Sequence, residues 1–282
     1  MYEIHEKLIE EMQEYLTRLG YSSETIKSYI KNLKYFFNWI IKENIEKVNQ
    51  STIDQYLKCL HKKPITSKTI QTKYNIIRHY NRYLEKTKNE KIITKPLELQ
   101  DIDLPKKAEI LTIKEIKKLY AVIEETIIGL RDKALLSLYY GCGLRNKEGT
   151  KVKIEDIDYK RSILEIKPGK NYQNRFIPLS IKVKEDLYRY QTQSRPYITN
   201  TKTNIFLLNN QGNPITPVTN RRIFNKLLEK SDIQKPITLH MLRHSLGTHL
   251  LKQGMQLEQI SQLLGHKSLD TTQIYAQIKN HE

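Results

Sequence analysis

Three histidines and an arginine stand within the stretch LHMLRHSLGTHLL, residues 239–251. A zinc ion could bind His240 and His244 from one helical face, but the stretch lacks the glutamate of an HExxH motif, and Arg243 opposes a dication. Core packing explains His244 and His249 better. At the start of a helix, His240 and Arg243 combine backbone N–H groups, an imidazole and a guanidinium, which all favour an anion. We therefore expect these two side chains to bind phosphate, and we expect no metal site.

Other segments of the chain hold further residues that could assist such a site. Arg145, in GCGLRNKEG, follows two glycines that end one helix and present the arginine at the start of the next. Lys170 lies in the turn of KPGKNYQNRFIPL, where an ammonium group is ordinarily only solvated. His266 directly follows a helix-ending glycine, and Tyr275 lies in a short closing helix. Each of these residues alone is weak evidence for a phosphate site, and only their combination is informative.

Helices account for most of the first 90 residues. The apolar spacing predicts four of them: one that ends at Gly20, one that begins at Ser22 or Ser23, a short one from Ser51, and one from about Ser67 to Lys86. Two prolines and the lack of a helical period make residues 91–108 a linker. We therefore expect a helical domain over residues 1–90 and a second domain over residues 109–282.

The second domain combines helices with a few strands. Thr112 and Glu115 form a capping box, and LRDKALLSLYYG continues as a helix. RSILEIK and NRFIPLS predict an antiparallel hairpin around PGKNYQN. Helices resume around residues 180–192, 219–230, 239–253 and 256–264. The expected fold is therefore mainly α with a small antiparallel sheet, and the second domain is α+β.

The charge of the chain indicates a polyanionic partner. Its 282 residues hold 48 Lys+Arg against 31 Asp+Glu, a net charge of +17. Basic side chains bind nucleic acid by releasing phosphate counterions, although a basic face can also be merely solvated. The predicted fourth helix carries such a face opposite its apolar stripe, and a helix laid against DNA explains it equally well. The candidates for DNA contact are Lys68, Arg78 and Arg82.

Several other classes of protein are disfavoured. No apolar run approaches the ~20 residues that span a bilayer. The N-terminus, MYEIHEKLIEEMQEYL, places acids among its apolar positions and is not a signal peptide. Cys59 and Cys142 are far apart, outside any CxxC motif, as is typical of ordinary thiols in a reducing cytoplasm.

Taken in chain order, the candidate residues resemble a known catalytic set. The sequence Arg145, Lys170, His240-x-x-Arg243, His266 and Tyr275 resembles that of the tyrosine recombinase family, which includes phage-type integrases and Xer recombinases. LHMLRHSLGTHLLKQG and LLGHKSLDTTQIYA are similar to the two signature boxes of the family, and GLRNKE and GKNYQNRFIPL to its first arginine box and lysine hairpin. The resemblance is specific over residues 135–277.

This resemblance implies a role for each member of the set. The first 90 residues would be the helical, SAM-like core-binding domain, and four copies, or pairs of two recombinases, would act on two duplexes in the cytoplasm. Tyr275 would attack a DNA phosphodiester and form a 3′-phosphotyrosyl link. Arg145 and Arg243 would hold the developing charge without a metal or other cofactor. His240 would accept or position the phenol proton, Lys170 would protonate the 5′-oxygen and His266 would hydrogen-bond the phosphate.

Two alternatives stay open at this point. A type IB topoisomerase shares the chemistry but normally relaxes DNA without site preference. A catalytically silent DNA-binding protein would have no reason to retain the complete set of six residues. The chain also departs from the family locally, since Lys147 and Gly149 stand where the family usually has Ser and Leu.

Overall fold

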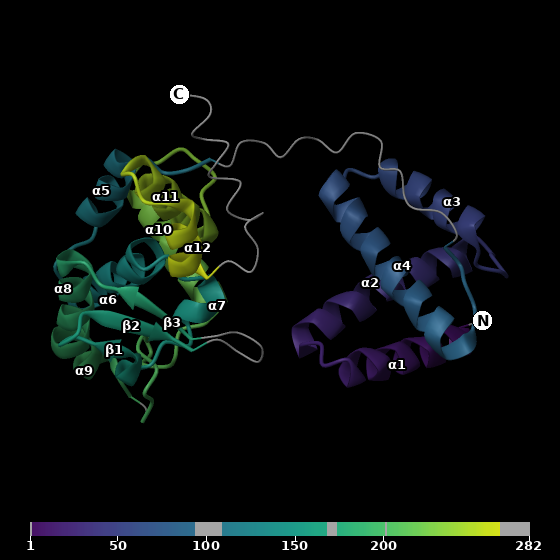
Figure 1. Cartoon of the computed structure of the whole chain (residues 1–282), viewed down its shortest axis with the longest axis horizontal. Helices are drawn as coiled ribbons and strands as arrows, with labels where there is room; N and C mark the ends of the chain where they lie inside the picture. The colour runs from purple at the N-terminus through teal and green to yellow at the C-terminus, as the bar shows by residue number, and fades with distance from the viewer. Residues whose placement is uncertain (1, 94–108, 168–173, 201, 266–282) are drawn as a thin grey trace. The chain divides into compact units, whose positions relative to one another are not determined.

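The computed structural model describes residues 2–93, 109–167, 174–200 and 202–265. The chain forms two compact units, Met1–Lys106 and Lys107–Glu282, which are described separately (Figure 1). Both are dominated by helices, and the second also holds a small antiparallel sheet. The predicted fold class is thus confirmed.

Helices make up the first unit. They are α1 (Tyr2–Arg18), α2 (Ser23–Lys42), α3 (Gln50–His61) and α4 (Ser67–Lys88), close to the predicted bounds. Side-chain caps set where the last three begin: Ser22, Asn49 and Thr66 each accept a hydrogen bond from a backbone N–H of the first turn. The turn between α1 and α2 places Gly20 at φ +75°, in the left-handed region that glycine adopts without strain.

Aromatic rings fill much of the core of this unit. Phe36 meets Tyr56 edge to face, and Phe37 meets Tyr80 in the same way, with centroids 5.0 and 5.4 Å apart. The predicted apolar stripe of α4 is buried: Ile70, Tyr74, Ile77 and Leu84. Since these side chains face inward, the basic residues on the other side of α4 are exposed.

The second unit contains most of the elements. Its helices are α5 (Ile113–Ala121), α6 (Ile127–Leu136), the π-helical turn η1 (Ser137–Gly141), α7 (Asn146–Gly149), the 3₁₀ turn η2 (Ile154–Asp156), α8 (Ile181–Arg189), the π-helical turn η3 (Tyr190–Ser194), α9 (Arg195–Ile198), α10 (Pro217–Lys230), α11 (Leu239–Lys252) and α12 (Leu257–Leu264). The strands are β1 (Ile157–Asp158), β2 (Ile163–Ile166) and β3 (Arg175–Pro178). The helix expected through Gly141 thus ends in a π turn, a form that is common at functional sites.

The sheet confirms the predicted hairpin and adds a strand to it. β2 pairs antiparallel with β3, with Leu164 opposite Ile177 and Ile166 opposite Arg175. The short strand β1, which the sequence pattern did not predict, pairs with the other edge of β2. Because Leu164 and Ile177 are both buried, the sheet has one face against the core.

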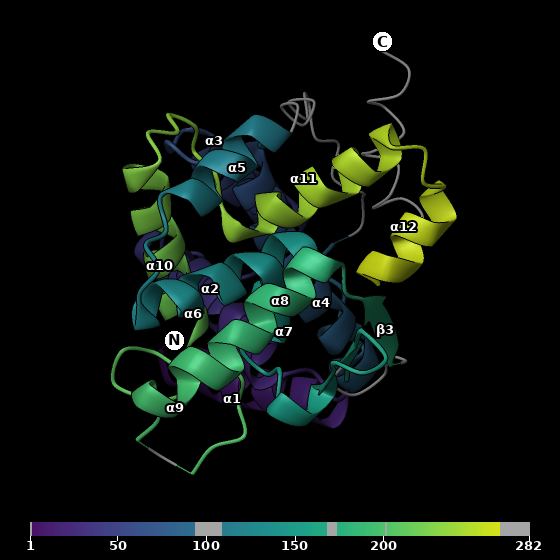
Figure 2. The ribbon, with the colours of Figure 1, turned by 90° about the vertical axis from the view of Figure 1, so that its left-hand side faces the viewer.

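Helix α11 carries His240 and Arg243. It packs on η1, which also contacts α6 and α8, and these segments lie side by side (Figure 2). Leu242, Ser245 and Thr248 of α11 have no exposed surface. Because most of the helix between Leu242 and His249 is buried, the side chains near its start have a rigid support. No helix of the described residues has the length and apolar content to cross a membrane.

One buried side chain in the first unit ties down the segment that follows α4. Asn81 Oδ1 accepts hydrogen bonds from the backbone N–H groups of Ile92 and Ile93, at 2.8 and 2.9 Å. Its Nδ2 donates to Glu85 at 3.1 Å. Both N–H groups would lose this acceptor if the side chain were shortened, and buried donors without partners are costly.

We expect Asn81→Ala to lower the free energy of unfolding of this unit by about 2 kcal/mol. Asn75→Ala, on the exposed side of the same helix, makes the same change in helix propensity and is expected to cost less than about 0.5 kcal/mol. The measurement is urea unfolding of the full chain followed by fluorescence of Trp39, the one tryptophan, which lies in α2. Equal losses in the two variants would contradict the anchoring role of Asn81.

Candidate active site

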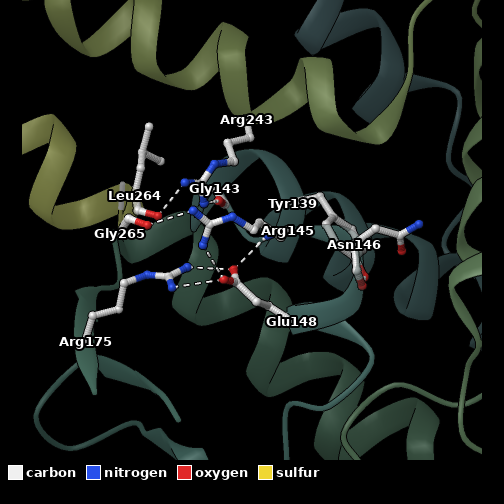
Figure 3. Close-up of polar contacts among 9 residues, drawn as sticks. All are labelled: Tyr139, Gly143, Arg145, Asn146, Glu148, Arg175, Arg243, Leu264 and Gly265. Atoms are coloured by element: carbon white, nitrogen blue, oxygen red, sulfur yellow. Dashed lines mark hydrogen bonds and ion pairs between the residues drawn. The ribbon is translucent and has the colours of Figure 1, made fainter. Parts of the chain in front are cut away.

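Arg243 and Arg145 converge on one end of helix α12. Arg243, only 1% exposed, donates from Nη1 to Gly143 O at 2.7 Å and from Nη2 to Leu264 O. Arg145 donates from Nη2 to Gly265 O at 2.7 Å (Figure 3). The carboxyl end of a helix carries partial negative charge and unpaired carbonyls, so it attracts cations. Two guanidinium groups from distant parts of the sequence are therefore held on consecutive carbonyl groups.

Glu148 holds the same arginine from the other side. Its carboxylate accepts from Arg145 N at 2.8 Å and from Arg145 Nη1 at 2.7 Å. It also accepts from Arg175 Nη1 and Nη2, at 3.1 and 2.7 Å. Burial opposes ionisation of this carboxyl, but the hydrogen bonds and charge of Arg175, helped by Arg145, lower the pKa of Glu148 to about 2. The carboxylate is therefore charged at any working pH.

Sequence reasoning missed both Glu148 and Arg175. Glu148 stands three residues after Arg145 in the first turn of α7, the position from which a glutamate returns to the N-cap backbone, and this signal could have been used. Arg175 had no comparable signal, because one arginine in a hairpin of a basic chain looks solvated.

Glycines permit the close approach of these elements. Gly143 has φ +63°, and a Cβ there would lie 2.6 Å from Leu264 and 2.9 Å from Leu246. A Cβ on Gly149 would overlap the hydroxyl end of Tyr139. Tyr139 donates to Asn146 O at 3.1 Å and so fixes the first residue of α7. The departure from the family at Gly149 therefore has a local cause, which is the ring that occupies the space.

The three histidines of α11 have different surroundings. His249 is buried and its Nδ1 lies 2.9 Å from Tyr140 Oη, as expected of a core histidine. His244 is half-buried and meets the ring of His240 edge to face, with centroids 4.5 Å apart. Burial, then His240 and Arg243, lower the pKa of His244 to about 4. His240 is exposed, and desolvation followed by the charges of Arg243 and Arg145 lowers its pKa as well. Both imidazoles are therefore neutral at pH 7.

The rest of the expected site lies outside the described residues. Lys170, His266 and Tyr275 belong to that part of the chain, although β2 and β3 flank Lys170 in the sequence and Gly265 directly precedes His266. The described residues therefore bring together Arg145, His240 and Arg243 of the predicted set. The same residues contain no group of three or more His, Cys, Asp or Glu placed to hold a metal ion.

The first unit carries two basic surfaces. Lys68, Arg78 and Arg82 are exposed on α4, as the apolar stripe predicted. The sequence analysis missed a second surface on α2, where Lys27, Lys31 and Lys34 line a groove against α1 with a volume of about 750 Å³. Both surfaces place positive charge on helices.

Comparison with known proteins agrees with these features. The model of the Phage integrase family matches residues 109–282, and that of the Phage integrase, N-terminal SAM-like domain matches residues 8–91. Tyrosine recombinase XerC of Anoxybacillus flavithermus is 31% identical over 93% of this chain and 90% of its own length. Tyrosine recombinase XerD of Listeria innocua is 30% identical over 92% and 89%.

Solved structures show the same fold. The crystal structure of XerA recombinase is 25% identical, with a TM-score of 0.54 over 95% of this chain and 92% of that chain. The Tn1549 transposon integrase, solved in complex with transposon right end DNA, has a TM-score of 0.76 at 17% identity, over 97% of this chain and 98% of that chain. From the family match over most of its length and these relatives, the chain belongs to the phage integrase family and is a tyrosine recombinase, an enzyme that cuts and rejoins DNA.

Proposed function

We propose that the chain is a site-specific recombinase in which Tyr275 attacks a DNA phosphodiester while Arg145 and Arg243 hold the phosphate. The observation that carries this proposal is the placement of both guanidinium groups on the carbonyls of Leu264 and Gly265, directly before His266. Attack on phosphorus builds negative charge on the non-bridging oxygens. Two fixed guanidinium groups beside one helix end can oppose that charge without a metal ion.

His240 is the proposed proton acceptor. A tyrosine has an ordinary pKa of about 10 and needs a base to attack at neutral pH. His240 stands one turn before Arg243 on α11, and its lowered pKa keeps it neutral and able to accept. The roles of Lys170 as proton donor to the 5′-oxygen and of His266 as a hydrogen-bond donor to the phosphate follow from the resemblance to the family.

The product of the attack is a covalent link between Tyr275 and a 3′-phosphate. The phosphate ester exchanges the deoxyribose oxygen for the phenol oxygen, so the energy of the bond is retained. A free 5′-hydroxyl of another strand can then displace the tyrosine, and rejoining needs no nucleotide cofactor.

Double-stranded DNA is the proposed partner of both units. Structural neighbours include XerH bound to its palindromic substrate and a lambda integrase dimer bound to a core site. We propose that residues 1–90 form the DNA-binding domain, that 91–108 link it to a catalytic domain over 109–282, and that four copies, or pairs of two recombinases, act on two duplexes. A cytoplasmic location fits two free thiols, one of them the buried Cys142.

The nucleophile can be tested with a nicked duplex built on the site that the protein selects from random-sequence DNA. Wild-type protein is expected to form a detergent-resistant adduct whose peptide map places the 3′-phosphate on Tyr275. Tyr275→Phe keeps the ring but removes the attacking oxygen, so it should bind DNA without forming the adduct. Arg145→Ala and Arg243→Ala should bind but cleave on the order of 10²-fold more slowly. An adduct on another tyrosine would refute the assignment of Tyr275.

The pH dependence of cleavage tests His240. Because the pKa of His240 is lowered below its ordinary 6.5, the neutral base predominates at pH 7, and the rate should fall as the pH drops through the lowered value. Glu148 titrates at about 2 and cannot produce this decline. His240→Gln should be slow and lack the acid limb, whereas His61→Gln, on the surface of α3, should keep the wild-type profile. An unchanged acid limb in His240→Gln would exclude His240 as the base.

Salt dependence tests the basic side of α4. Each phosphate contact releases counterions, so Lys68→Ala, Arg78→Ala and Arg82→Ala should each lower the slope of log K against log salt by about 0.9. Lys58→Ala, on α3, removes the same charge elsewhere in the unit and serves as the control. Slopes equal to wild type in all three α4 variants would remove this helix from the interface.

A further inference from the structure

Arg175 touches the groups that hold Arg145. It is the first residue of β3, and its side chain is only 13% exposed. Its two terminal nitrogens donate to the two oxygens of Glu148 in a fork, at 3.1 and 2.7 Å (Figure 3). A Cβ added to Gly265 would lie 3.1 Å from Arg175 Cδ, so the arginine also lies against the residue whose carbonyl accepts from Arg145. Arg175 thus contacts both partners of the Arg145 guanidinium.

The charges explain why a second arginine matters here. Arg145 and Glu148 alone form a neutral pair, which would weaken the attraction for a phosphate. With Arg175 the three groups carry a net charge of +1, within a site that is partly shielded from solvent. Arg175 therefore restores the positive charge that Glu148 cancels.

The hydrogen bonds point the same way. In the fork, Arg175 Nη2 binds Oε2 while Arg145 Nη1 binds Oε1, so Glu148 engages the side chain of Arg145 through one of its terminal nitrogens. If Arg175 were absent, both carboxylate oxygens could turn to Arg145 in a bidentate pair. Such a pair would draw the guanidinium toward Glu148 and away from the carbonyl of Gly265.

We infer that Arg175 is a positioning residue for strand cleavage, which holds Glu148 so that Arg145 stays directed at the phosphate. The inference rests on the role proposed above for Arg145. β3 also pairs with β2 through Arg175 and Ile166, and Lys170 stands between these two strands in the sequence. The ion pair between Arg175 and Glu148 therefore fixes the paired strands β2 and β3 relative to α7.

The test compares four variants in single-turnover cleavage of the nicked duplex: Arg175→Gln, Arg145→Ala, the double variant Arg145→Ala with Arg175→Lys, and Arg189→Gln. Arg189 is the matched control, because its Nη2 pairs with Glu125 at the same 2.7 Å in the same unit. DNA affinity and thermal unfolding are measured for each protein. If Arg175→Gln does not fold, Arg175→Lys takes its place, since it keeps the charge but cannot form the fork.

Arg175→Gln should cleave on the order of 10- to 100-fold more slowly with unchanged DNA affinity, while Arg189→Gln should match wild type. Because Arg175 acts through Arg145 and the lysine keeps the charge beside Glu148, the double variant should be no slower than Arg145→Ala within about 2-fold. Arg175→Lys should show the same pattern with a smaller loss.

Two results would overturn the inference: wild-type cleavage by a folded Arg175→Gln, or a further loss of about 10-fold in the double variant, which would mean that Arg175 acts independently. Failure of the proposed function looks different. In that case Arg145→Ala itself would cleave at the wild-type rate.

Discussion

The candidate site depends on the carboxyl end of α12, where arginine side chains donate hydrogen bonds to the last carbonyl groups. α12 stops at Leu264 and Gly265, and their carbonyls accept from Arg243 and Arg145. This contact joins three segments that are far apart in the sequence: the glycine-rich turn before α7, the start of α11, and the last turn of α12. Gly143 allows the approach, since any side chain there would collide with Leu264. The core around α11 then has to hold these segments at fixed distances, and the buried residues of that helix, among them Leu242, Ser245 and Thr248, provide the required rigidity.

Electrostatics in this region follow from one partly buried carboxylate, Glu148, between the guanidinium groups of Arg175 and Arg145. Burial raises the pKa of Glu148, whereas Arg175 and Arg145 lower it to about 2, and the carboxylate in turn accepts hydrogen bonds from both. The two arginines at the end of α12, Arg145 and Arg243, differ in their exposure. Arg243 is enclosed and donates to backbone carbonyls, whereas Arg145 retains 37% of its side-chain exposure. Of the two, Arg145 is therefore the more exposed to solvent.

Local patterns in the sequence were enough for most of the fold. The helices of the first unit, the β2–β3 hairpin and the buried stripe of α4 followed from apolar spacing and from capping residues such as Ser22 and Thr66. Arg145, His240 and Arg243 were identified as candidates, and the structure places the two arginines together. Arg175 and the short strand β1 were not foreseen, because both depend on partners distant in the sequence. The basic groove on α2 was missed for another reason: its lysines were read only against the apolar spacing of that helix.

The contact between Gly149 and Tyr139 has a consequence for evolution and for engineering. The resemblance noted in the sequence places a leucine of the family where this chain has Gly149, and here the ring of Tyr139 fills that volume. The two positions are expected to behave as an epistatic pair: a leucine at 149 is compatible only with a smaller residue at 139, and a tyrosine at 139 only with glycine at 149. A chimaera that takes residues 143–149 from a relative would change Gly149 but keep Tyr139. Residues 137–149, which include both positions, should therefore be exchanged together.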